Sequence, residues 1–75
     1  MLITATDLLK EFVESHIGAA TRSRYAKAAY YMCVIKDIYV YLNREDEFKG
    51  YFNNILAQNK RRPALRDEMG IVYGS

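Results

Sequence analysis

Apolar residues recur at helical spacing on both sides of a two-residue break at Asn43 and Arg44. The segment before the break, 22–42, carries two apolar stripes: Tyr25, Ala28, Ala29, Met32, Ile35 and Tyr39 on one, and Tyr31, Val34, Ile38, Tyr41 and Leu42 on the other. The segment after it has apolar residues at positions i, i+3, i+4, i+7 and i+8, namely Phe48, Tyr51, Phe52, Ile55 and Leu56. Two helices with so short a connection fold back antiparallel. The pattern predicts a helical hairpin, with Asn43 as a left-handed cap that its short amide tolerates.

A shorter amphipathic helix is predicted ahead of the hairpin. Thr4 is a good helix cap, and the acidic Asp7 follows three positions later, near the positive end of the helix. One apolar stripe then runs along the helix: Leu8, Leu9, Phe12, Val13 and Ile17. Gly18 is expected to stop this helix, because glycine enters the left-handed cap conformation without steric cost. Thr21 is then placed to cap the first helix of the hairpin.

The expected fold is all-α: an antiparallel helical hairpin with a short N-terminal helix and a short C-terminal fourth helix. Pro63 ends the third helix and suits the first position of the fourth, 64–69. Residues 70–75 show no periodicity and are expected to fray. We interpret residues 1–75 as a single small helical domain, either standing alone or excised from a longer protein.

Length and composition narrow the class of protein. A chain of 75 residues buries a small core, and the single cysteine, Cys33, cannot form an internal disulfide. An oligomer or a neighbouring domain would supply the missing stability. Charged residues interrupt every apolar run before it reaches the roughly 18–20 residues of a membrane span, and no signal peptide is recognisable. These features predict a cytoplasmic protein that does not enter a membrane.

The sequence offers no catalytic, metal or cofactor site. His16 and Cys33 fall on different predicted helices and do not form a nucleophile–base pair, and a structural zinc site needs four ligands. We interpret Cys33 as a small core residue and His16 as a surface residue at a helix end. Glu45, Asp46 and Glu47 open the third helix, where the helix dipole favours acids. We therefore expect a protein that is not an enzyme and binds no cofactor.

One family resemblance extends over residues 25–69. Its pattern is Tyr25, Ala28, Ile35, Ile38, Tyr39 and Leu42, an acidic run, Phe48, Tyr51 and Ile55, then Lys60-Arg61-Arg62-Pro63-Ala64-Leu65 and Glu68-Met69. This resembles the C-terminal helical segment of bacterial SWIM zinc-finger proteins. The resemblance implies a helical accessory module of bacterial type. The cysteines and histidine of the zinc finger are absent, so no zinc or nucleic-acid role passes to any residue here.

Basic residues are expected to gather at one end of the hairpin. In an antiparallel arrangement, Arg22 and Arg24 at the start of the second helix lie beside Lys60, Arg61 and Arg62 after the third. Such a cluster suggests an anionic partner: a phosphate, an acidic protein surface, or Asp67 and Glu68 of the chain itself. The favoured interpretation is a solvated end that keeps the domain in solution. The net charge of +2 and the pI of about 8.8 are lower than in most nucleic-acid-binding domains.

The seven tyrosines favour protein contact, because a tyrosine offers a large apolar body with a polar tip. The second helix is apolar on more sides than its neighbours can cover. The candidate interface on it comprises Tyr30, Tyr31, Val34, Ile38 and Tyr41. The predicted function is therefore a non-catalytic protein-interaction or oligomerisation module, whose partner is a second copy in a homodimer or another protein. The less favoured alternative is a nucleic-acid-associated accessory element that binds phosphates through the basic end.

Overall fold

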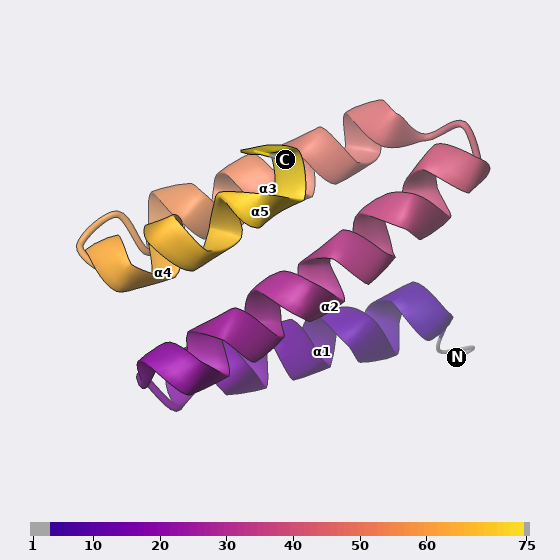
Figure 1. Cartoon of the computed structure of the whole chain (residues 1–75). Helices are drawn as coiled ribbons and strands as arrows, with labels where there is room; N and C mark the ends of the chain where they lie inside the picture. The colour runs from indigo at the N-terminus through magenta and orange to yellow at the C-terminus, as the bar shows by residue number, and fades with distance from the viewer. Residues whose placement is uncertain (1–3, 75) are drawn as a thin grey trace.

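The computed structural model describes residues 4–74 and contains five α-helices (Figure 1). They are α1 (Ala5–Gly18), α2 (Arg22–Tyr41), α3 (Glu45–Gln58), α4 (Pro63–Met69) and the single turn α5 (Ile71–Gly74). Residues 4–74 contain no β-strand. The prediction of an all-α fold is confirmed.

The central helix of the domain is α2. Figure 1 shows α1 running antiparallel along one side of it, with α3, α4 and α5 on the other. Helix α3 is antiparallel to α2, as expected for a hairpin, but α4 makes the more extensive contact with α2. The short fourth helix therefore packs directly on the central helix and forms part of the core.

Two of the predicted caps form as the sequence indicates. The hydroxyl of Thr4 accepts a hydrogen bond from the backbone N–H of Asp7, whose carboxylate accepts one from the N–H of Thr4. This reciprocal pair is a capping box, and it satisfies two N–H groups that the first turn leaves free. At the start of α2, the hydroxyl of Thr21 accepts a hydrogen bond from the N–H of Arg24, 3.3 Å away.

The turn between α2 and α3 depends on one left-handed residue. Asn43 has φ 60°, and its N–H donates to the carbonyl of Val40 at 3.0 Å. The N–H of Arg44 reaches back to the carbonyl of Tyr39 at 2.8 Å. These two bonds form a Schellman motif, which closes the C-terminus of a helix and reverses the chain within two residues. The predicted role of Asn43 is confirmed.

The end of α1 differs from the prediction. Gly18 is the last helical residue, and no glycine among residues 4–74 has a positive φ. The left-handed position falls instead on Ala20, with φ 58°, whose N–H donates to the carbonyl of Ile17 at 3.1 Å. The expectation that Gly18 stops the helix in this conformation is wrong. The reversal occurs two residues later, directly before Thr21 begins to cap α2.

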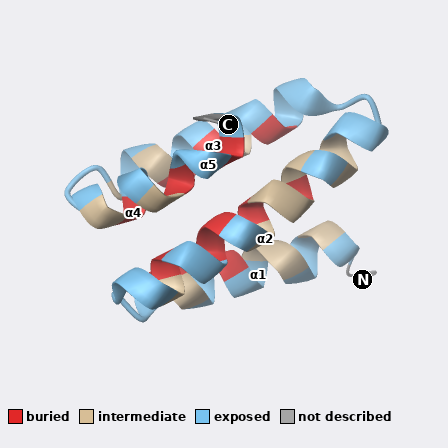
Figure 2. Cartoon of the chain, in the orientation of Figure 1, coloured by how far each residue is buried: buried red, intermediate tan, exposed pale blue. Residues whose placement is uncertain are grey.

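Side chains from all five helices meet in one core, whose buried residues line the space between the helices in Figure 2. Its members are Val13, Ile17, Tyr25, Ala28, Ala29, Met32, Ile35, Phe48, Phe52, Ile55, Leu65, Met69 and Val72. The rings of Phe48 and Phe52 stack with centroids 5.8 Å apart. Only part of the apolar stripe of α1 is buried, because α2 is the main neighbour of α1. Leu8 and Phe12 remain exposed.

The C-terminal segment also differs from the expected frayed tail. Residues 71–74 form α5, and the side chain of Val72 is buried in the core. The ammonium group of Lys36 on α2 donates a hydrogen bond to the carbonyl of Val72 at 2.9 Å and lies 4.2 Å from the centroid of the Tyr73 ring. Tyr73 in turn contacts Phe52 edge to face, with centroids 5.2 Å apart. These contacts come from distant positions in the chain, and Ser75 lies outside the described residues.

The α1–α2 connection leads to a stability prediction. A Cβ added at Gly18 would meet nothing within 4 Å, so Gly18→Ala should raise the free energy of unfolding by up to about 1 kcal/mol, because alanine favours the helix. Ala20→Gly should also stabilise, by ~0.5–1 kcal/mol, because it relieves the left-handed strain. Ala19→Gly is the matched control, since Ala19 has φ −68° and gains no relief from glycine. Urea denaturation of the three variants measures the change in the free energy of unfolding. Equal decreases for Ala19→Gly and Ala20→Gly would contradict a left-handed strain at Ala20.

Candidate interaction site

The side of α2 that faces away from the core carries four of the residues predicted to form an interface. Tyr30, Val34, Ile38 and Tyr41 follow one another at intervals of four, four and three residues, so they lie along one helix face. Tyr30 is 64% exposed and Tyr41 is 88% exposed, whereas Val34 and Ile38 are half-buried. We name these four residues the outer strip. The fold thus leaves a continuous apolar line on the surface of its central helix.

Tyr31, the fifth predicted interface residue, joins the outer strip to α1. Its ring centroid lies 5.8 Å from that of Tyr30, 5.6 Å from that of Phe12 and 5.6 Å from that of His16. Phe12 belongs to the predicted apolar stripe of the first helix but is 50% exposed. The spacing in the sequence separates the exposed residues of the α1 stripe from the buried ones. Leu8 and Phe12, four residues apart, share one edge of the stripe, whereas Val13 and Ile17 share the other.

His16 is part of this aromatic surface and is held in one orientation. Its ring stacks on Tyr31 with an interplanar angle of 11°, and the Nε–H of Arg24 donates to its Nδ1 at 2.6 Å. Burial lowers the pKa of His16, and the positive charges of Arg24 and Lys27 lower it further. The imidazole is therefore neutral at pH 7, and its Nδ1 is occupied as a hydrogen-bond acceptor.

Three further tyrosines, on α2 and α3, lie in the core or at its edge. Tyr25 is buried, and Tyr39 accepts a hydrogen bond from the ammonium group of Lys10 at 2.9 Å. The same ammonium group lies 4.7 Å from the ring centroid of Tyr51. The hydroxyl of Tyr51 is buried without a hydrogen-bond partner among residues 4–74, and burial raises its pKa. Tyr25, Tyr39 and Tyr51 therefore stabilise the domain, and Tyr30, Tyr31 and Tyr41 lie on the outer side of α2.

The basic end comprises Arg22, Arg24, Lys60, Arg61 and Arg62. Two of these residues reach neighbouring positions of α1: Arg24 contacts His16, and Nη1 of Arg62 donates to the carbonyl of Ile17 at 2.9 Å. The fold therefore brings the start of α2 and the α3–α4 connection to the same end of the domain. The partners of both arginines are neutral, so they orient the guanidinium groups and leave their charge uncompensated.

Arg22 differs from the other members of the basic end because it is paired with acids of α4. Its Nε donates to Oε1 of Glu68 at 3.1 Å, and its Nη2 lies 3.6 Å from Oδ2 of Asp67. Of the anionic partners considered from the sequence, the chain's own acids are the ones that Arg22 meets. Lys60 and Arg61 are exposed and form no ion pair within residues 4–74.

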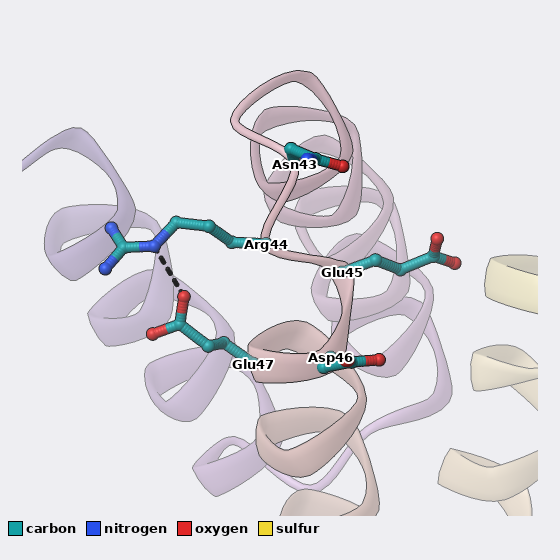
Figure 3. A pocket seen from close by; sticks show the side chains of 5 residues that line it. All are labelled: Asn43, Arg44, Glu45, Asp46 and Glu47. Carbon is teal, nitrogen blue, oxygen red and sulfur yellow. Dashed lines mark ion pairs between the residues drawn. The ribbon is translucent and has the colours of Figure 1, made fainter.

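The acidic turn at the opposite end borders an open depression lined by Asn43, Arg44, Glu45, Asp46 and Glu47. Figure 3 shows Glu47 paired with Arg44, while Glu45 and Asp46 point to the other side of the turn. Carboxylates that diverge in this way do not form a cation cage, which needs several oxygens around one point. All three acids lie in the first turn of α3, where they interact favourably with the helix dipole.

Cys33 lies at the edge of the core and is half-buried, which is less burial than its predicted role as a core residue implies. Burial and the nearby Asp37 raise the pKa of its thiol. Within residues 4–74, no three histidine, cysteine or acidic side chains are grouped closely enough to hold a metal ion. In the same part of the chain, every helix is too short or too polar to cross a membrane.

The comparisons with known proteins return no relative. No protein-family model matches the chain, and neither a curated protein nor a solved structure matches it. The resemblance to the helical segment of SWIM zinc-finger proteins therefore stays a prediction.

The surroundings of His16 lead to a pH prediction. Its pKa in the folded state is below 6.5, the ordinary value that it regains on unfolding. The unfolded chain therefore binds a proton first as the pH falls, so stability decreases as the pH drops below about 6.5. His16→Gln should remove this contribution and flatten the pH dependence. Denaturant titrations of both proteins at intervals between pH 5 and 7.5 measure the difference, and parallel curves would show that His16 is not perturbed.

Proposed function

We propose that this protein is a non-catalytic helical module that binds another protein surface through the outer strip and the adjoining aromatic residues of α1. The observation that carries the proposal is the exposure of Tyr30 and Tyr41 on a helix whose other side already fills the core. Neither tyrosine contributes to the core of the domain. Both are therefore available to contact another protein.

The chemistry of this surface supports protein contact. Tyrosine and phenylalanine contribute large contact areas at interfaces and lose little conformational freedom when they are fixed. Phe12, Tyr30 and Tyr31 already lie against one another, so part of the ordering cost of binding is met in the free domain. Covering this apolar area would contribute about 25 cal/mol per Å² before the cost of association is subtracted.

The small size of the domain favours self-association as the form of contact. A chain of 75 residues buries a modest fraction of its surface, and oligomerisation is a common way to add burial. Twofold homodimers are the commonest assembly, and they use the same patch on both copies. A long helix with an exposed apolar line suits such a patch.

Charge introduced on the outer strip tests the proposal. Tyr41→Glu places a carboxylate at the most exposed of the large apolar side chains among residues 4–74, so the fold should be kept and the association weakened at least about tenfold. Val40→Glu is the control, because Val40 lies on the same helix, about 100° away around its axis, and is 49% exposed. Sedimentation velocity over a concentration series measures the association, and circular dichroism checks the fold. A wild-type protein that stays monomeric and binds no other protein would overturn the proposal.

A second candidate function is phosphate binding by the basic end. The observation in its favour is that Arg24 and Arg62 are both held at the end of α1 by neutral groups, while Lys60 and Arg61 are exposed. The ion pairs of Arg22 with α4 reduce the available charge. Cationic side chains near the C-termini of α1 and α3 also suit the negative ends of these helices, so we rank this function second.

Salt dependence tests the second candidate. Four phosphate contacts predict that the affinity for a labelled DNA duplex falls roughly a hundredfold between 50 and 200 mM salt, because bound counterions are released. The double variant Lys60→Gln/Arg61→Gln should lower the slope of log affinity against log salt by about two. Lys49→Gln, an exposed lysine near the start of α3, is the control. Fluorescence anisotropy measures both values, and an absence of binding at 50 mM salt would exclude this function.

A further inference from the structure

The outer side of α2 is arranged symmetrically about its midpoint. Four pairs of residues on this side lie at equal distances before and after Met32: Tyr30 and Val34, Lys27 and Asp37, Ala26 and Ile38, and Ser23 and Tyr41. In three of the pairs one residue complements the other in charge or in size, and the central pair, Tyr30 and Val34, is apolar. All eight are exposed or half-buried, whereas the side chain of Met32 itself points into the core.

This arrangement matters because of the geometry of antiparallel helices. When two identical helices cross antiparallel at a twofold axis, a residue before the crossing point faces the residue that lies equally far beyond it on the other copy. In a parallel pair, each residue faces its own copy. The pairs about Met32 therefore meet one another only in the antiparallel arrangement.

Charge favours the antiparallel arrangement. Lys27 and Asp37 are the charged residues of the face that the outer strip occupies, and both are exposed. An antiparallel pair brings Lys27 of each copy next to Asp37 of the other, which forms two ion pairs. A parallel pair would place lysine beside lysine and aspartate beside aspartate. Exposed ion pairs add little affinity, but like charges in contact select against the wrong orientation.

Size favours the same arrangement. Ser23 and Ala26, the small residues of this face, would lie opposite Tyr41 and Ile38, the large ones. Small side chains create the space that large ones fill, so the helices could approach closely on both sides of the crossing point. The crossing point near Met32 lies at the middle of α2 (Arg22–Tyr41), so both halves of the helix are used. A crossing angle of about 20°, common for long helices, keeps both ends in contact.

We propose that the partner of the outer strip is a second copy of this chain, paired antiparallel through α2 with the twofold axis near Met32 and with reciprocal contacts between Lys27 and Asp37. This inference rests on the proposed function and specifies the partner and its orientation. The Phe12 side chains, exposed on α1 next to Tyr31, flank the contact on each copy.

Charge exchange tests the orientation. Lys27→Glu and Asp37→Lys should each weaken the dimer about fivefold, because each creates two like-charge contacts in the twofold pair. The double variant Lys27→Glu/Asp37→Lys should restore the wild-type dissociation constant, since the opposite charges then face one another again. Lys49→Glu, which lies on α3, is the control and should change nothing. Sedimentation equilibrium at low salt measures the dissociation constants of the wild type and the four variants, and a double variant as weak as the single ones would overturn the inference.

Disulfide trapping gives an independent readout. In a Cys33→Ser background, Lys27→Cys and Asp37→Cys chains should form a crosslinked dimer when mixed and oxidised, whereas neither should crosslink efficiently alone. The mixed pair faces across the interface, but each residue lies five positions from Met32, so identical cysteines are held apart. Crosslinking of each chain alone, without the mixed product, would show a parallel pair and overturn the inference while leaving the proposed function intact. A monomeric wild type that binds a different protein would also overturn it.

Discussion

The packing of the four other helices against α2 is the constraint on which the rest of the structure depends. Ala28 and Ala29 are fully buried on this helix, and their small side chains let neighbouring helices come close. Met32 and Ile35 continue the same buried side. Because α1, α3, α4 and α5 all pack on α2, loss of this packing would separate segments that share few other contacts. The domain is thus organised around one helix and is not a layered bundle of equal members.

Polar contacts hold the ends of the other helices to this centre. Lys36 binds the carbonyl of Val72 in α5, Lys10 of α1 binds the hydroxyl of Tyr39, and Arg62 binds the last turn of α1 at Ile17. Each contact uses a long, flexible side chain whose apolar stem packs along the protein while its charged tip reaches a polar partner. Such contacts add little free energy individually, but they fix where each helix ends relative to α2.

The same organisation explains why the candidate functions lie where they do. The face of α2 that no other helix covers is open, and it carries the exposed tyrosines Tyr30 and Tyr41 beside Lys27 and Asp37. The basic end follows from chain reversal, because α1 and α3 both terminate where α2 and α4 begin. Interaction along the helix and anion binding at its end would use different surfaces, so they are compatible within one molecule.

Local patterns in the sequence determined the first four helices and the turn between α2 and α3. The periodicity of apolar residues, the Thr4 cap and the left-handed Asn43 are properties of a few neighbouring residues, and such properties can be read directly. The sequence also placed Tyr30, Tyr31, Val34, Ile38 and Tyr41 on one side of α2. The sequence separates the two edges of the α1 stripe, Leu8 with Phe12 and Val13 with Ile17, but it does not show which edge another helix covers.

Tertiary structure alone decided the remaining features. Val72 is contacted by Lys36, Arg22 is paired with α4, and His16 is oriented by Arg24 and Tyr31. Each of these joins residues whose proximity no local pattern encodes. The left-handed conformation of Ala20 belongs to the same class, because a nearby glycine was locally the better choice. The sequence determined where the first four helices form, whereas the packing of distant segments on α2 decided which residues remain exposed, because that packing depends on contacts between residues far apart in the chain.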